Sequence, residues 1–247
     1  MIYTNELTKI GGKAAALAKL SRVVDNIPPW FAVGIDGASE EEIALTLDRF
    51  DEHTLFAVRS SASDEDGSVH SFAGQFETYL NIPESQVVEN IKKVQQSADS
   101  ERVVAYMRER GIEHVSAPAV LVQQMVKADF AGVAFGANPV TGNTKECMIS
   151  AVCGLGDKLV DGSVDADTYI VCGGDRGNDG DVRNGHVEGN DGHVEGNGVL
   201  SHEQCKEIAG LCRKVSRYFG RYQDIEWAYE NGDLFLLQSR QIGRAHV

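Results

Sequence analysis

The chain has 247 residues, with Asp+Glu 37 against Lys+Arg 23 and a formal net charge of −14. A surface this acidic repels nucleic-acid phosphates as a whole, so we expect no nucleic-acid binding, whereas an anionic ligand needs only a local basic pocket. No apolar run approaches the roughly 20 residues that cross a bilayer, and the N-terminus lacks a secretory pattern. We therefore expect a cytoplasmic protein that does not bind membranes.

Predicted helices and strands alternate along the first half of the chain. One helix begins at the glycine turn of GGKAAALAKL, and another begins at a capping box formed by Ser39 and Glu42. The expected elements are a helix over 11–20, a strand over 30–33, a helix from 40 to about 50, strands over 55–59 and 75–82, and helices from about 84 to 110.

The second half contains mainly strands. A second capping box, Ser201 with Gln204, opens a helix whose apolar residues follow helical spacing and which ends at Gly220. A hairpin over 224–239 follows this helix. The other expected strands cover 119–126, 130–137, 146–152 and 168–172.

Residues 173–198 are rich in glycine and contain GHVEGN twice. Two copies are too few for a repeat architecture, so a surface excursion is the favoured interpretation, with a metal site at His186 and His193 as the alternative. The cysteines form no CxxC pair, so we expect free thiols rather than a zinc site. They are Cys147, Cys153, Cys172, Cys205 and Cys212.

The C-terminal hairpin carries polar side chains in otherwise apolar surroundings, namely Asp224, Glu226 and Gln238. If Asn231-Gly232 forms a two-residue turn, Gln238 and Glu226 point to opposite faces. A three-residue loop over 230–232 instead places Gln238 opposite Asp224 and on the face of Glu226. We predict this second register, because it gathers two carboxylates and one amide oxygen, which are hard ligands for Mg²⁺.

The same register places Arg240 on this face, within reach of a phosphate. The alternative is that these acidic residues form only the solvated face of a strand. Gly11-Gly12-Lys13 at a helix start resembles an anion site, or else the glycines only turn the chain. Arg59 precedes the small residues 60–62 and fits a phosphate clamp, with a surface ion pair to residues 64–66 as the alternative.

Taken together, several segments in one order resemble the N-terminal ATP-binding domain of the family containing phosphoenolpyruvate synthase, pyruvate phosphate dikinase and rifampin phosphotransferase. The segments are GGKAAALAKL, PPWFAV, AVRSSASDEDGSVHSFAGQFETYLNI, VLVQQMVKADFAGVAFGANPVTG, ISAVCGLGDKLVDGSVDADTYIV and QDIEWAYENGDLFLLQSRQI. The resemblance implies an α+β, ATP-grasp-like fold with two lobes of mixed or antiparallel sheet and helices enclosing a nucleotide cleft. We expect the lobes at 1–118 and 119–247.

The resemblance also implies roles for individual residues, with ATP and Mg²⁺ as cofactors. Lys13 and Arg59 would hold the ATP phosphates, and Glu226 with Gln238 would bind Mg²⁺. Asp224 would be the supporting acid and Arg240 the phosphate-side arginine. The remaining implied contacts are a phosphate loop with Ser71, Ala73 and Gly74, then Thr78 behind it, and an adenine hinge with Gln124, Met125 and Val126.

In this family a pyrophosphoryl group passes from ATP to a histidine on a swivelling domain. The motif of that histidine is absent from this sequence, so we expect a separate phosphohistidine-domain protein as partner. Gly136 replaces a usual threonine, and Asp157 replaces a usual glutamate. A stand-alone ATP-dependent phosphotransferase or ligase, and a non-catalytic nucleotide-binding module, stay open as alternatives.

Overall fold

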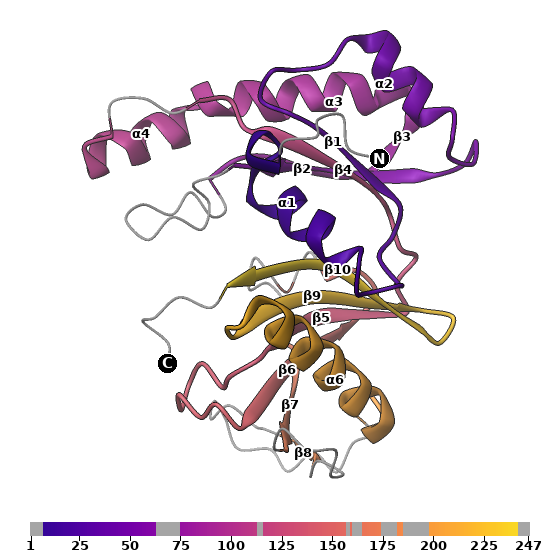
Figure 1. Ribbon diagram of the computed structural model, residues 1–247, viewed down its shortest axis with the longest axis vertical. Coiled ribbons are helices and arrows are strands. Elements are labelled where there is room, and N and C mark those ends of the chain that lie inside the picture. The colour runs from indigo at the N-terminus through magenta and orange to yellow at the C-terminus, as the bar shows by residue number, and fades with distance from the viewer. Residues whose placement is uncertain are drawn as a thin grey trace. The chain divides into compact units, whose positions relative to one another are not determined.

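The computed structural model describes residues 7–62, 75–112, 116–156, 159, 165–173, 182–184 and 198–241. The chain divides into two compact units, Met1–Met125 and Val126–Val247. Each unit is built on one antiparallel sheet with helices, so the α+β class is confirmed (Figure 1). We describe each unit by itself.

The first unit has a four-stranded sheet in the order β1-β4-β2-β3. Helix α1 lies on one face of this sheet, and α2 and α3 lie on the other (Figure 1). Its elements are η1 (Leu7–Lys9), α1 (Gly11–Leu20), β1 (Trp30–Val33), α2 (Glu40–Leu47), β2 (Leu55–Ser61), β3 (Thr78–Pro83), α3 (Glu84–Gln96), η2 (Ser97–Asp99), α4 (Glu101–Arg110) and β4 (Ala119–Gln124).

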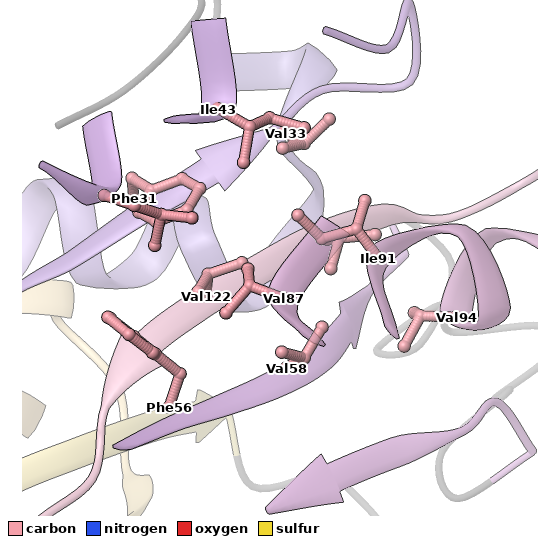
Figure 2. Packing of buried hydrophobic residues seen from close by; sticks show 11 residues of the cluster. Phe31, Val33, Ile43, Phe56, Val58, Val87, Ile91, Val94 and Val122 are labelled. Carbon is pink, nitrogen blue, oxygen red and sulfur yellow. The ribbon is translucent and has the colours of Figure 1, made fainter. Parts of the chain in front are cut away.

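Strand alternation builds two cores from this one sheet. In β1, Phe31 and Val33 face α2 and α3, whereas Trp30 and Ala32 face α1. Figure 2 shows the first core, where Val87 and other side chains of α3 pack onto the sheet. Both cores are required because both faces of the sheet carry apolar side chains, and each needs a helix to remove them from water.

The helix signals in the sequence are confirmed. Ser39 accepts a hydrogen bond from the Glu42 backbone N–H, and the Glu42 carboxylate accepts one from the Ser39 N–H, which completes the capping box. Helix α4 ends at Gly111 in the left-handed conformation, with φ at 66°. Such signals are local, so they are readable without knowing the tertiary structure.

The boundary between the units differs from the predicted one at 118. Strand β4 was expected in the second lobe, but it pairs with both β1 and β2 near the middle of the first sheet. The first unit therefore extends to Met125. The next strand in the chain, β5, belongs to the other sheet, so the two strands lie in different units although they are close in sequence.

The second unit has a six-stranded sheet in the order β10-β9-β5-β6-β7-β8. Helix α6 packs across one face, into which Cys205, Ile208 and Cys212 are fully buried (Figure 1). Its elements are β5 (Phe130–Phe135), β6 (Glu146–Cys153), β7 (Asp167–Cys172), β8 (Val182–Asn184), α6 (His202–Phe219), β9 (Gln223–Glu230) and β10 (Asp233–Gln241).

The glycine-rich stretch contains one strand that we did not expect, because β8 pairs with β7. The rest of that stretch, including His186 and His193, lies outside the described residues. The capping box at Ser201 and Gln204 is confirmed, and so is the helix end at Gly220, which has φ at 67°.

Candidate functional site

The β9-β10 hairpin has a two-residue turn, so the predicted three-residue loop is wrong. Glu230 pairs with Asp233, and the turn residues Asn231 and Gly232 both have positive φ, at 52° and 87°. This is the geometry of a type I′ turn, which suits an Asn-Gly pair because its twist matches that of the two strands. Gln238 therefore does not lie opposite Asp224.

A β-bulge nevertheless brings the predicted ligands together. The register shifts between Leu236 and Gln238, so one extra residue of β10 is accommodated there. Beyond this bulge Gln238 pairs with Glu226, and Arg240 pairs with Asp224. Directly paired residues of antiparallel strands share a face. The four predicted side chains thus share one face of the sheet, although by a different mechanism from the predicted one.

Asp224 and Arg240 form an ion pair with two hydrogen bonds. The Arg240 Nε and Nη2 atoms donate to Asp224 Oδ2 at 3.1 and 2.8 Å. Burial nevertheless raises the pKa of the Asp224 carboxyl, and the nearby Glu226 carboxylate raises it further, while Arg240 opposes both effects. Two carboxylates, Asp224 and Glu226, share this face with the single cation Arg240, which favours an additional cation.

Gln238 supplies a test of whether a cation fits. Its side chain is only 7% exposed, and its Oε1 atom has no hydrogen-bond partner among the described residues. A buried carbonyl oxygen without a partner costs about 1–3 kcal/mol. An oxygen-preferring divalent ion placed between Gln238 and the opposite Glu226 would remove that cost. The residues present therefore fit Mg²⁺.

The neighbouring residues on this face are apolar. Val133 and Phe135 of β5 lie opposite Glu226 and Asp224. Further along, Ala228 packs with Phe235 and Leu237. The polar side chains thus have apolar neighbours on these strands, and electrostatic interactions are stronger where fewer polar groups compete.

In the first unit, the start of α1 is fastened to the end of β2. The Ser61 hydroxyl donates to the Ile10 carbonyl at 2.7 Å and accepts from the Ala14 N–H at 3.0 Å. A Cβ at Gly11 would lie 1.4 Å from the Ser61 carbonyl oxygen, and Gly11 has φ at 71°. Only glycine fits there, so the glycine turn has a packing reason.

Two backbone N–H groups at the start of α1 already donate hydrogen bonds within the protein. The Gly12 N–H donates to the Ala62 carbonyl at 3.1 Å, in addition to the Ala14 bond. These two N–H groups are not available to a phosphate, so the expected backbone anion site is reduced. Lys13 lies between them, and its side chain is the stronger candidate for a phosphate contact.

Arg59 and Lys13 belong to the same side of the first sheet. Arg59 is two residues before Ser61 in β2 and therefore on the same face, to which the start of α1 is fastened. Thr78, the first residue of β3, lies directly opposite Arg59. The structure thus brings the predicted Arg59 and Thr78 together and places Lys13 on their side of the sheet.

Gln123 lies in the strand predicted as the adenine hinge, but no contact was predicted for its side chain. It pairs with Ala57 and so shares the face of Arg59; it is 3% exposed, and its Nε2 atom has no partner among the described residues. Its only signal in the sequence is that it is one of two adjacent amides at the end of a strand that is otherwise apolar. The indole Nε1 of Trp227 is also unpartnered in the described part. That ring lies on the α6 face and we assign it no role.

The predicted adenine hinge has less free backbone than expected. The Gln124 N–H donates to the Pro29 carbonyl, and the Met125 N–H donates to the Leu55 carbonyl, both at 2.8 Å. Neither N–H can read a base. Val126 begins the second unit and is buried among apolar side chains.

A hollow of about 700 Å³ opens in the first unit beside Pro28-Pro29. Gln124 lines it, but neither Lys13 nor Arg59 does. Its charged side chains are Asp25, Arg49 and Asp51, so acidic groups outnumber basic ones and the balance of charge disfavours phosphates. We therefore assign no nucleotide to it.

Several predicted positions lie outside the described residues, namely Ser71, Ala73, Gly74 and Asp157. Gly136 is described, and the structure explains the missing threonine. A Cβ at Gly136 would lie 2.7 Å from Ser216 Oγ and 3.0 Å from the Gln223 carbonyl oxygen. Helix α6 therefore leaves no room for a side chain at that position.

The described residues contain no group of three or more His, Cys, Asp or Glu side chains placed to hold a metal ion. A site here has to use Gln238 as well as carboxylates. Within the described ranges, no helix is both long and apolar enough to span a bilayer.

Comparison with known proteins identifies relatives. The chain is 37% identical over 211 residues to a probable phosphoenolpyruvate synthase of Methanocaldococcus jannaschii, covering 78% of this chain and 17% of that protein. It is 34% identical over 218 residues to rifampicin phosphotransferase of Bacillus cereus, covering 82% of this chain and 25% of that protein. Among solved structures, D-alanine–D-alanine ligase of Helicobacter pylori is similar over 94% of this chain and 54% of its own, at 10% identity and a TM-score of 0.49.

The curated relatives are much longer than this chain, which covers 17% to 27% of their length. The sequence profile described as pyruvate phosphate dikinase, AMP/ATP-binding domain, matches residues 34–246. This chain therefore belongs to the pyruvate phosphate dikinase AMP/ATP-binding domain family.

Proposed function

We propose that this chain binds Mg·ATP and forms the nucleotide-binding part of a dikinase-type phosphotransferase with an ATP-grasp-like cleft. The observation that carries the proposal is the Glu226–Gln238 pair, in which a buried carbonyl oxygen that has no hydrogen-bond partner within the described ranges lies opposite a carboxylate. A carboxylate and an unpartnered carbonyl oxygen on directly paired residues are both acceptors, and an oxygen-preferring cation can satisfy them together. A cytoplasmic location is part of the proposal.

The basic residues have a common task in this function. A triphosphate carries charge over many oxygens, and its transfer needs that charge offset by fixed cationic groups. Lys13, Arg59 and Arg240 supply these groups. The two hydrogen bonds from Arg240 to Asp224 hold its guanidinium in one orientation, so less conformational entropy is lost when it meets a phosphate.

The remaining contacts follow the family resemblance. The phosphate contacts proposed for Ser71, Ala73 and Gly74 lie outside the described residues, and Thr78 is proposed as a further contact. The base lies at Gln124, Met125 and Val126, where carbonyl groups and the Gln123 amide replace the two occupied N–H groups. Mg²⁺ held by Glu226 and Gln238 neutralises phosphate charge when bound.

The proposed reaction needs a histidine from another domain or protein. That histidine attacks the β-phosphorus of ATP, the bond from the β-phosphorus to the α–β bridging oxygen breaks, and AMP leaves. The pyrophosphoryl group stays on the histidine. This chain contributes positioning and charge, and a separate phosphohistidine domain is the proposed partner.

Product analysis tests this function. The chain is incubated with ATP and Mg²⁺, with and without a protein carrying the histidine domain, and the nucleotides are separated by chromatography. We expect AMP only in the mixture. ADP as the sole product, or equal turnover without the histidine domain, contradicts the proposal.

Two variants assign the effect to the phosphate contacts. Lys13→Ala and Arg59→Ala should each abolish AMP formation while the fold remains, because each removes one fixed positive charge. Lys19→Ala is the matched control, since Lys19 is an exposed residue of the same helix. Full activity in Lys13→Ala would defeat the phosphate assignment of that residue.

A further inference from the structure

Arg102 of helix α4 binds the segment that precedes β3. The Arg102 Nε and Nη2 atoms donate to the Gln75 carbonyl oxygen at 2.9 and 2.5 Å. The same guanidinium lies 3.5 Å from the Glu77 carboxylate. An arginine has paired donors in one plane, so it can place two of them on a single carbonyl, whereas a lysine has only one compact ammonium.

The two residues after Gln75 are also fixed by this region. Phe76 is 5% exposed and packs with Ala98 and Val103. The Glu77 N–H donates to Ser97 Oγ at 3.3 Å, and that hydroxyl donates to the Val94 carbonyl at 2.6 Å. Three consecutive residues are therefore held by α4 and by the turn before it.

The same apolar cluster reaches the end of β2. Ala62 packs against the cluster of Phe76, Ala98 and Val103, and its carbonyl accepts the Gly12 N–H at the start of α1. The contacts around Phe76 thus connect α4 to the place where α1 and β2 meet. Lys13 follows Gly12 directly.

These contacts matter because β3 is an edge strand with one neighbour. It pairs only with β2 in the described sheet, and a bulge with Asn81 at φ 57° interrupts that pairing. Thr78, opposite Arg59, is the first residue of this weakly held strand. Its position therefore depends on the anchoring of residues 75–77 as well as on the sheet.

We propose that Arg102 is a positioning residue for nucleotide phosphates. It holds the start of β3 against β2 beside Arg59, without touching the nucleotide itself. This rests on the proposed function, in which Arg59 contacts the phosphates. Loss of Arg102 loosens the Arg59–Thr78 pair, so ligands that depend on phosphate contacts lose affinity, whereas ligands held by the base do not.

The test measures ATP and AMP affinities by titration calorimetry with Mg²⁺ for the wild type, Arg102→Ala and Arg102→Lys. We expect Arg102→Ala to weaken ATP binding about tenfold and AMP binding less than twofold. Arg102→Lys should lie between the wild type and Arg102→Ala, because the ammonium can still donate to the Gln75 carbonyl but lacks the planar pair of donors. Hydrogen exchange at residues 75–77 should rise in Arg102→Ala. Arg108→Ala is the matched control, since Arg108 is an exposed arginine of the same helix with no side-chain hydrogen bond or ion pair to other described residues.

Unchanged ATP affinity in Arg102→Ala overturns the proposal, and so does an equal loss of ATP and AMP affinity. An equal effect of Arg108→Ala would show only a general charge effect, which also overturns it. If Arg102→Ala does not fold, Arg102→Lys decides by the same ratio of ATP to AMP. Failure of the wild type to bind ATP is a different result, because it defeats the proposed function itself and this inference with it.

Discussion

Replacing Gln238 by Met should make the metal-free protein more stable and its response to Mg·ATP smaller. Methionine has nearly the shape of glutamine, so the packing of this 7% exposed side chain is kept. The substitution removes a buried carbonyl oxygen that has no partner among the described residues, which costs about 1–3 kcal/mol. For a unit of this size, that corresponds to a rise in Tm of roughly 3–5 °C per kcal/mol.

Gln238→Met should reduce the stabilisation of the protein by Mg·ATP, although it raises the stability of the metal-free protein. A ligand present at about 100 times its Kd stabilises the folded state by about 2.7 kcal/mol. The wild type should therefore gain roughly 8–13 °C when saturated with Mg·ATP. Gln238→Met should lose most of this gain, because one ligand of the ion is gone. Differential scanning calorimetry with and without Mg·ATP measures both quantities.

Gln223 offers a matched control in the neighbouring strand. It is 4% exposed like Gln238, but its Nε2 donates to the Tyr222 carbonyl at 3.3 Å and its Oε1 accepts from Ser239 Oγ at 3.0 Å. Gln223→Met should therefore lower stability by about 1–3 kcal/mol. If Gln238→Met also lowers metal-free stability to that extent, or keeps the full response to Mg·ATP, the reasoning about its unpartnered oxygen is refuted.

Two further predictions concern Gly136 and Asp224. Gly136→Thr should lower the free energy of unfolding by about 1–3 kcal/mol in urea titrations, because its Cβ would meet Ser216 Oγ at 2.7 Å. Adding Ser216→Ala to this variant should recover part of the lost stability. A Gly136→Thr variant with wild-type stability would contradict the contact. Asp224→Asn should match or exceed wild-type stability at pH 7, because burial raises the pKa of Asp224 above its ordinary value of 3.8 and the ionised form is therefore disfavoured in the folded state. This difference should vanish as pH falls through the folded pKa, where the wild type takes up its proton; a variant that is less stable at pH 7 would mean that the Arg240 pair outweighs burial.

The hairpin shows what alternation in a sequence predicts and what it does not. Polar residues at 224, 226, 238 and 240 indicate a shared face, and the structure has that face. The bulge is invisible because Leu236 and Leu237 are consecutive apolar residues on opposite sides, so neither looks misplaced. The prediction used a three-residue loop to place the four polar side chains on one face. The protein instead has a tight Asn-Gly turn, and the bulge between Leu236 and Gln238 shifts the register so that the four side chains share a face.

The first unit shows a second limit. The helix starts at Ser39 and Ser201 were predictable because capping depends on residues three apart. The place of β4 was not, because its partners β1 and β2 lie far from it in the chain. In the same way, consecutive glutamines 123 and 124 face opposite sides, and only the pairing reveals that the first shares the face of Arg59.

The most direct test of the central claim replaces Mg²⁺ by Mn²⁺ and follows the free-ion signal by electron paramagnetic resonance. In the presence of ATP, the wild-type chain should take up one Mn²⁺ beyond that bound by ATP alone or hold the Mn·ATP complex with a changed signal. Glu226→Gln combined with Gln238→Met should abolish this effect. Equal uptake and an equal signal in the double variant would contradict the account, because the ion would then be held without the two side chains that define the site.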